Sequence, residues 1–293
     1  LGPEESERLQ AVTIRALTGV APDTAAVARA VSGATSAGRR ALRASVPTMA
    51  ASIPRPADVE LLEQHLAAER PATEHESFVH IGLPAASAGD FDRAIAATRD
   101  LSPALAARGV EFRALFAMLP VSRVDQARSR RLLEALRELP TTTRTGERIR
   151  RDGVESMFVP RNLLLDALLS LRLGDTSRAE SVAVDLDRYG TGLVATFAQD
   201  YAGLIRARLA IARRNPAAAL ELLGSPRPEG HLAYPDITSW PKALDRYTRA
   251  EAFIALGRSG DARKWLEGFP DNTGYDVAFL PAVRRLAARL GPK

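Results

Sequence analysis

The stretch that decides the fold reads RLGDTSRA and covers residues 172–179. Similar stretches recur as ALGRSGDA over residues 255–262, RRNPAAA over residues 213–219 and AGDFDRA over residues 88–94. In each stretch, an Ala-, Leu- or Arg-rich segment ends at glycine or a polar residue, and helix-forming residues follow. The recurrence therefore predicts helices that are joined in antiparallel pairs by tight turns.

Aligned on these turns, the four copies agree at fixed offsets. An apolar residue stands at Val79, Leu164, Leu204 and Tyr247, a small one at Gly82, Ala167, Ala207 and Ala250, a turn residue at Gly89, Gly174, Arg214 and Gly257, and alanine at Ala94, Ala179, Ala219 and Ala262. Small residues let two helices approach closely, and glycine accepts the left-handed backbone of a turn. The last three alanines are 40 and 43 residues apart, which predicts a helical repeat.

The segments between the turns are also helical in character. Leu163, Leu164, Ala167, Leu168 and Leu171 follow the i, i+3, i+4, i+7 spacing of one helix face. Ala, Leu, Arg and Glu fill most of the chain, and all four favour helices. No segment shows two alternating strand-like runs around a hairpin turn. We therefore predict an all-α protein.

The joint pattern of a small residue, a turn glycine seven positions later and alanine five positions after that resembles the tetratricopeptide repeat. The resemblance covers residues 158–268 and, in degraded form, residues 74–138. It implies an α-solenoid of antiparallel helical hairpins in a right-handed superhelix. The period of 40 to 43 residues departs from the usual value of about 34. The tail from Arg246 to Leu280 is similar to the repeat regions that end some large bacterial signalling proteins, namely serine/threonine kinases and transcriptional activators.

These patterns predict four regions along the chain. They are an N-terminal helical or junction segment over residues 1–72, degenerate hairpins over 73–140, a basic linker over 141–157, and repeats over 158–293 that end in a capping helix around residues 279–290. Residues 231–240 interrupt the last two hairpins. This interruption is either a structured loop that packs Trp240 into the core or part of a binding site.

Composition excludes several kinds of protein. The chain has 293 residues, 46% of them hydrophobic, and no cysteine, which excludes disulfides, thiolate nucleophiles and cysteine-bound metals. No apolar run reaches the length of about 18 residues that a transmembrane helix needs. The formal net charge is +5, and only Lys242, Lys264 and Lys293 are lysines, so 37 of the 40 basic residues are arginines. These arginines are interleaved with Asp and Glu, as on solvated helix faces.

Motifs that carry chemistry are missing from the sequence. His75 and His80 flank Glu76, but their i, i+5 spacing turns the two imidazoles roughly 140° apart on a helix. A zinc-protease helix needs the i, i+4 spacing instead. The chain also lacks a glycine-rich phosphate loop that ends in Gly-Lys-Ser/Thr. We therefore expect no enzymatic activity, no metal and no cofactor.

The remaining expectation is a non-catalytic scaffold or sensor segment that binds proteins within a larger bacterial signalling or regulatory protein. The resemblance implies that a peptide or partner domain binds the concave face. Its inward positions would be Arg161, Arg172, Tyr201, Arg208 and Glu251. Two alternatives stay open, a nucleic-acid-binding helical repeat that uses its arginines, and a structural subunit of a stable complex. Without a visible targeting segment, a cytoplasmic location is the default.

Overall fold

A computed structural model describes residues 82–98, 106–139, 155–189, 193–225, 235–269, 276 and 278–290. Within these ranges every regular element is helical and no strand occurs, which confirms the all-α prediction. The helices are α6 (Leu83–Ala88), α7 (Phe91–Ala96), α8 (Ala106–Met118), α9 (Gln126–Arg137), α11 (Glu155–Arg172), α12 (Thr176–Asp187), α13 (Leu193–Ala212), α14 (Pro216–Leu223), α15 (Pro235–Ala255), α16 (Ser259–Glu267) and α18 (Leu280–Arg289). The predicted segment 1–72 and residues 141–154 of the predicted linker lie outside the described residues.

Four tight turns join α6 to α7, α11 to α12, α13 to α14, and α15 to α16, at the positions that the alignment selected. The turn residue is left-handed in all four, with φ of 87° at Gly89, 86° at Gly174, 59° at Arg214 and 73° at Gly257. Glycine adopts this conformation without steric cost, whereas Arg214 must adopt it with a side chain. The sequence therefore placed these turns correctly.

The residue after the turn caps the second helix in three of the four pairs. The side chains of Asp90, Asp175 and Asn215 accept hydrogen bonds from the backbone N–H three residues later, at 3.1, 2.9 and 3.2 Å. Each bond satisfies an N–H group that has no partner inside the helix. The aligned Arg258 provides no such cap for α16. Turn and cap together explain why a short local pattern is enough to start the second helix.

The small residues of the pattern lie where helices cross. Ala94, Ala179, Ala219 and Ala262 are all fully buried, as are Ala167, Ala207 and Ala250. A Cβ atom on Gly82 would lie only 2.9 Å from ring atoms of Phe116 in α8. Larger side chains at these positions would push the paired helices apart, because protein interiors are close-packed.

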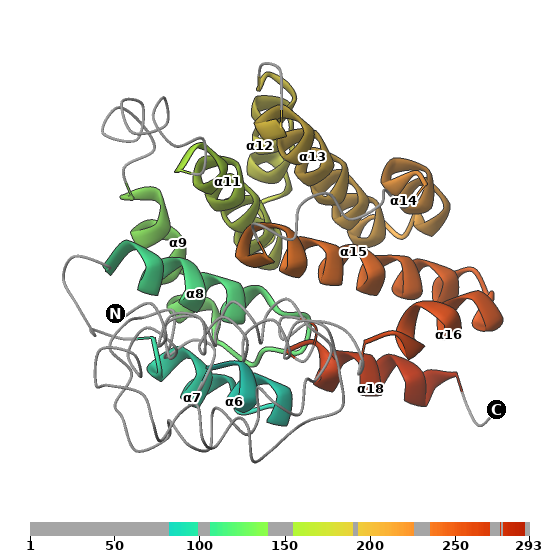
Figure 1. The fold of residues 1–293 in the computed structure, drawn as a ribbon. Coiled ribbons are helices and arrows are strands. Elements are labelled where there is room, and N and C mark those ends of the chain that lie inside the picture. Colours follow the sequence, from blue (N-terminus) through green and yellow to red (C-terminus); the bar gives the residue numbers. More distant parts are fainter. Residues whose placement is uncertain are drawn as a thin grey trace, which may run out of the picture.

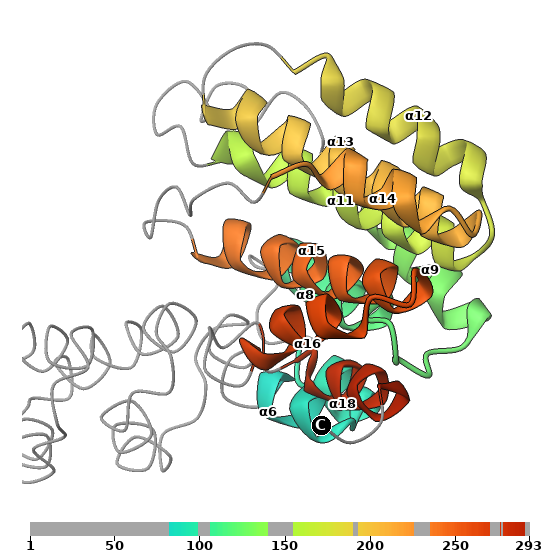
Figure 2. The same ribbon diagram turned by 90° about the vertical axis from the view of Figure 1, so that its right-hand side faces the viewer.

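The helix pairs stack side by side in chain order (Figure 1). Helices α8, α11, α13 and α15 lie next to one another in that sequence, and α9, α12 and α14 pack beside them. The C-terminal helix α18 contacts α15 and α16, and it also contacts α6 (Figure 2). The first and last described helices therefore meet.

One hydrophobic cluster extends from Leu83 to Leu286 through the array. Its largest fully buried side chains include Phe116 of α8, Leu165 of α11 and Trp240 of α15. Trp240 packs into the core, as one of the two alternatives for residues 231–240 required, but it lies in helix α15, which begins at Pro235, and not in a loop. Proline is tolerated in the first turn of a helix, where its missing N–H removes no intrahelical bond.

No helix in the described residues combines the length and the apolar character that crossing a membrane requires.

Candidate functional site

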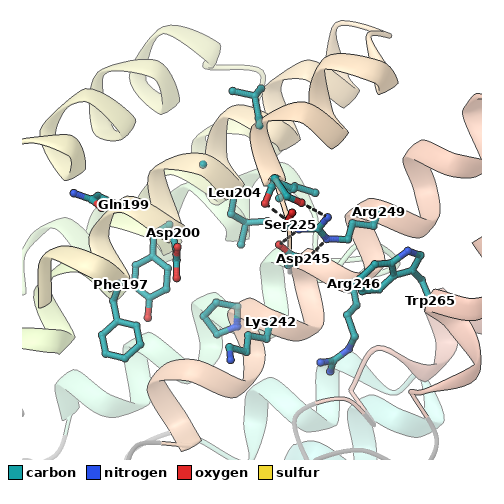
Figure 3. A pocket seen from close by; sticks show the side chains of 16 residues that line it. Phe197, Gln199, Asp200, Leu204, Ser225, Lys242, Asp245, Arg246, Arg249 and Trp265 are labelled. Atoms are coloured by element: carbon teal, nitrogen blue, oxygen red, sulfur yellow. Dashed lines mark hydrogen bonds and ion pairs between the residues drawn. The ribbon is translucent and has the colours of Figure 1, made fainter. Parts of the chain in front are cut away.

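A pocket of about 590 Å³ lies at the junction of the last two helix pairs (Figure 3). Helix α13 contributes Phe197, Gln199, Asp200, Tyr201, Gly203 and Leu204, and the end of α14 with the two residues after it contributes Leu222, Leu223, Gly224 and Ser225. Helix α15 contributes Pro241, Lys242, Asp245, Arg246 and Arg249, and α16 contributes Trp265. The pocket is therefore formed by four helices and is open to solvent on one side.

The pocket lies beside the end of α14, which is a short helix. It has 8 residues, whereas the equivalent helix α12 has 12, so α14 ends about one turn earlier. The chain leaves α14 at Gly224, whose φ is 59°. Among the described residues, α14 therefore covers less of the first half of α13 than a helix of the length of α12 would. What remains is a space between α13 and α15.

The walls of the pocket include aromatic and aliphatic side chains from several helices. Phe197 and Tyr201 stack one turn apart on α13, with ring centroids 6.5 Å apart and an interplanar angle of 25°. Leu204 and Trp265 add apolar surface from two other directions. Leu222 is 43% exposed and is one of only three large hydrophobic residues in the described ranges that are so exposed. This surface suits an apolar side chain that enters from outside.

Three charged groups of the pocket, Asp245, Arg246 and Arg249, form ion pairs. Arg249 donates from Nε to Asp245 at 2.5 Å and from Nη1 and Nη2 to the carbonyls of Gly224 and Leu223 at 2.8 and 3.0 Å. Its guanidinium also lies over the ring of Trp265, 5.1 Å from the centroid. These contacts hold the carboxylate, the end of α14 and the indole in fixed positions. Such an arrangement supports recognition by shape and apolar contact.

A second arginine of α15, Arg246, extends away from Arg249 (Figure 3). It forms an ion pair with the fully buried carboxylate of Asp276. Its guanidinium lies 5.3 Å from the centroid of the Phe269 ring. Arginine favours such sites because its planar group can bind a carboxylate and stack on an aromatic face together.

The contact between Arg249 and α14 is one example of a recurring polar contact between consecutive helix pairs, which we call a joint. Residues 166, 206 and 249 are 40 and 43 residues apart, and each binds the end of the preceding second helix. Asp166 binds Arg137 at the end of α9, and Arg206 binds Asp187 at the end of α12. The hydrogen bond from Arg206 lowers the pKa of Asp187, although burial acts in the opposite direction.

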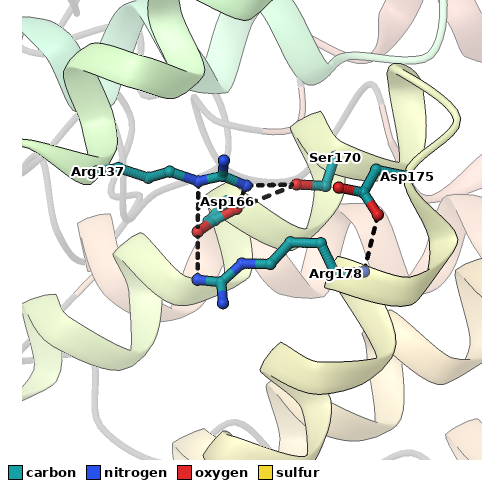
Figure 4. Close-up of polar contacts among 5 residues, drawn as sticks. All are labelled: Arg137, Asp166, Ser170, Asp175 and Arg178. Atoms are coloured by element: carbon teal, nitrogen blue, oxygen red, sulfur yellow. Dashed lines mark hydrogen bonds and ion pairs between the residues drawn. The ribbon is translucent and has the colours of Figure 1, made fainter.

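The joint at Asp166 is the most connected of these (Figure 4). The carboxylate accepts hydrogen bonds from Arg137 Nε and Nη2 at 3.2 and 2.8 Å, from Arg178 Nη2 at 2.8 Å and from Ser170 Oγ at 3.1 Å. Burial by itself would raise the pKa of Asp166, but the bonds from Arg137 and Arg178 outweigh it, so the pKa lies below its ordinary value. This cluster ties α9, α11 and α12 together.

Two of the residues that the sequence proposed for binding lie on α11, where Arg161 is buried and Arg172 is half-buried. Arg161 of α11 has a side chain only 3% exposed and forms an ion pair with Glu111 of α8. Arg172 donates to the carbonyls of Ser122 and Val124, the latter at 3.1 Å, and burial lowers its pKa. Both side chains connect α11 to the α8–α9 segment, so in this structure they stabilise helix packing.

The other three lie around the junction of α13 and α15. Tyr201 is 2% exposed and forms part of the pocket wall. Arg208 and Glu251 form an ion pair between α13 and α15, with side chains 20% and 29% exposed. A binding role for the five residues stays a prediction. Sequence reasoning missed Leu222, Arg249 and Trp265, although the repeat spacing of positions 166, 206 and 249 contained a signal for Arg249.

In the part of the chain that the structure describes, no three histidine, aspartate or glutamate side chains gather as a metal site would require. The basic residues 144–151 and the histidine pair at positions 75 and 80 lie outside the described residues. No protein-family model, no curated protein and no solved structure matches this chain.

Proposed function

We propose that this chain is a non-catalytic binding module built on a tetratricopeptide-like helical repeat. Its role would be that of a scaffold or sensor segment in a larger bacterial signalling or regulatory protein. The observation that carries the proposal is the pocket between α13 and α15, which combines apolar side chains such as Leu222 and Trp265 with arginines that already bind carboxylates and carbonyls. The four left-handed turns at the aligned positions support the repeat itself.

The dimensions of the pocket favour a peptide side chain as its occupant. Ligand clefts in proteins commonly measure about 300–1,000 Å³, and peptide recognition depends on a few apolar or aromatic anchors that enter such clefts. The volume of about 590 Å³ falls within this range. Leu222 and Trp265, which are not buried, offer apolar surface against which an anchor side chain can pack. The ligand would therefore be a peptide that presents a large apolar residue.

The test is a selection from a random peptide library with the full chain as the target, followed by affinity measurements on two variants. Leu222→Glu places a charge at the pocket, where the side chain is 43% exposed, so the fold should tolerate it. Val184→Glu makes a comparable change on α12, where the side chain is 42% exposed and does not line the pocket.

We expect selected peptides to share an aromatic residue or leucine and to bind Leu222→Glu at least about tenfold more weakly than wild type. Val184→Glu should bind them within about twofold of wild type. Selection of no peptide, or equal losses in both variants, would count against the pocket as the binding site.

A further inference from the structure

The repeat itself shows what fills the place of the pocket in the other helix pairs. Seven residues after the aligned alanine stand Leu186 in the α11–α12 pair and Phe269 in the α15–α16 pair, and both side chains are fully buried. In the α13–α14 pair the same position is Pro226, which lies outside the described residues, and α14 has already ended at Leu223. The described part of this pair therefore holds no counterpart of the two buried side chains.

The exposure of Leu222 agrees with a missing neighbour. Three residues after the aligned alanine, α12 has Val182, which is fully buried, whereas α14 has Leu222, which is 43% exposed. Leu222 lines the pocket together with Trp265, the equivalent residue of α16. The pocket thus adjoins the end of α14, at the point where α12 continues for another turn.

In the preceding pairs a helical turn with two apolar side chains occupies this point. Val182 and Leu186 are four residues apart on α12, so they lie on one face of the helix, one turn apart. Helix α9 has the same spacing at Leu132 and Leu136, which are 8% and 2% exposed. The joints described above align the ends of α9 and α12. The fold therefore fills this point with large apolar residues at positions i and i+4.

The length of the pocket matches this spacing. Its lining on α13 extends from Phe197 to Leu204, two helical turns or about 10 Å. Side chains at positions i and i+4 of a helix have Cβ atoms about 6 Å apart. Two such side chains therefore fit along the pocket, beside Leu222 and Trp265.

The polar groups of the pocket favour an occupant whose backbone is already hydrogen-bonded. The guanidinium of Arg249 binds Asp245 and two carbonyls, and that of Arg246 binds a buried carboxylate. An extended peptide needs partners for the N–H and C=O groups that it buries, whereas a helix satisfies its own. Lys242 and Asp200, the other charged residues of the lining, are of opposite sign. Charge complementarity thus favours an uncharged, apolar helix face.

We propose that the occupant of the pocket is an amphipathic helical segment of a partner protein, with two large apolar side chains at positions i and i+4. This inference rests on the proposed function, because it specifies the conformation of the peptide that the pocket would bind. One side chain would take the place that Leu186 takes in the α11–α12 pair. The other would lie one turn farther along α13, toward Phe197.

The experiment compares three fluorescein-labelled, alanine-based peptides of about 18 residues, which is long enough for such a peptide to form a helix by itself. The first carries leucine and phenylalanine four positions apart, on one face of a helix. The second has the same composition, but its leucine and phenylalanine are two positions apart and share a face only in an extended chain. The third is the first with a central alanine replaced by proline. Fluorescence anisotropy measures the binding of each peptide to the full chain.

We expect the first peptide to bind at least about tenfold more tightly than the other two, because only it presents both side chains from one face of a helix. Leu222→Glu should weaken its binding at least about tenfold, whereas Val184→Glu should leave it within about twofold of wild type. Equal affinities of the three peptides, or tighter binding of the second, would overturn the inference in favour of an extended ligand. Dimers of the chain that Leu222→Glu dissociates would identify a second copy as the occupant and would overturn it as well.

The peptides selected from the random library give an independent result. If none of the three designed peptides binds, selected peptides with apolar residues three or four positions apart, and with binding that proline abolishes, would support the inference. Selected peptides with apolar residues two positions apart would overturn it. In that case a loss of binding in Leu222→Glu would still support the proposed function, so the two proposals can fail separately. Failure of every peptide to bind would count against both.

Discussion

Replacing Asp166 by asparagine tests whether the joints between helix pairs stabilise the array. The side chain of Asp166 is 6% exposed and binds two arginines from two other helices. Asparagine has nearly the same size, so packing is preserved. It loses the negative charge, however, and it turns an N–H donor toward a group that donates as well. The change therefore isolates the electrostatic part of the joint.

The magnitude follows from the contacts that are lost. Hydrogen bonds to a charged group contribute about 1.5–3 kcal/mol each in buried sites. Arg137 and Arg178 are 42% and 35% exposed, so water can partly replace the lost carboxylate. We therefore expect Asp166→Asn to lower the free energy of unfolding by about 2 kcal/mol, far less than removal of a partner from a fully buried pair.

Urea denaturation followed by circular dichroism at 222 nm measures the effect. Asp185→Asn is the matched control, because Asp185 pairs with Arg188 at 3.5 Å and both side chains are well exposed, at 45% and 74%. Such surface pairs contribute less than about 0.5 kcal/mol. Equal free energies of unfolding for the two variants would refute the assignment of a structural role to the Asp166 cluster.

The pH dependence of the stability difference between wild type and Asp166→Asn is a second check. The folded pKa of Asp166 lies below the value of about 3.9 that is usual for an unfolded chain. Its contribution is therefore complete above about pH 5 and is lost as the pH falls through the folded pKa. The gap in stability between wild type and Asp166→Asn should narrow below about pH 4. A gap that is constant between pH 3 and pH 7 would contradict the reasoning.

Three further predictions use other parts of the fold. Glu111→Gln should destabilise the chain by about 3–5 kcal/mol, because Arg161 is 3% exposed and loses its charged partner. Urea denaturation should show that the double variant Glu111→Leu/Arg161→Met recovers most of this loss. Gly174→Ala should lower the free energy of unfolding by about 1 kcal/mol, because φ is 86° at this position. Arg214→Gly, at a φ of 59°, should raise the free energy of unfolding by up to about 1 kcal/mol. Thermal melting that shows the same sign for both variants would contradict this. Absorbance at 295 nm should reveal a tyrosine that titrates near pH 12, and this titration should be missing in Tyr247→Phe. Because the pKa of Tyr247 is raised in the folded state, the stability of the chain should fall between about pH 10 and 12.

Local features of the chain were readable from the sequence because their physical causes are local. The left-handed turns at Gly89, Gly174 and Gly257, which the aligned pattern predicted, depend only on residues next to them. The same holds for the helical spacing of the apolar residues. Residue pattern therefore predicted the all-α class and the positions of the hairpins.

The binding residues could not be read in the same way, because burial depends on partners that are distant in sequence. Arg161 was placed on an inward helix face, but whether such a face is open depends on Glu111, fifty residues earlier in α8. Tyr201 likewise became a pocket wall because α15 and α16 lie against α13 and α14.

The sequence by itself determined that the chain forms helices and where most of them pair, since backbone conformation and capping involve only neighbouring residues. Tertiary structure decided that α14 ends early enough to leave a pocket beside α15, that α18 returns to contact α6, and which arginines stay exposed. The physical reason is that solvent exposure and ion pairing are properties of surfaces, and surfaces form only when helices far apart in the chain come together.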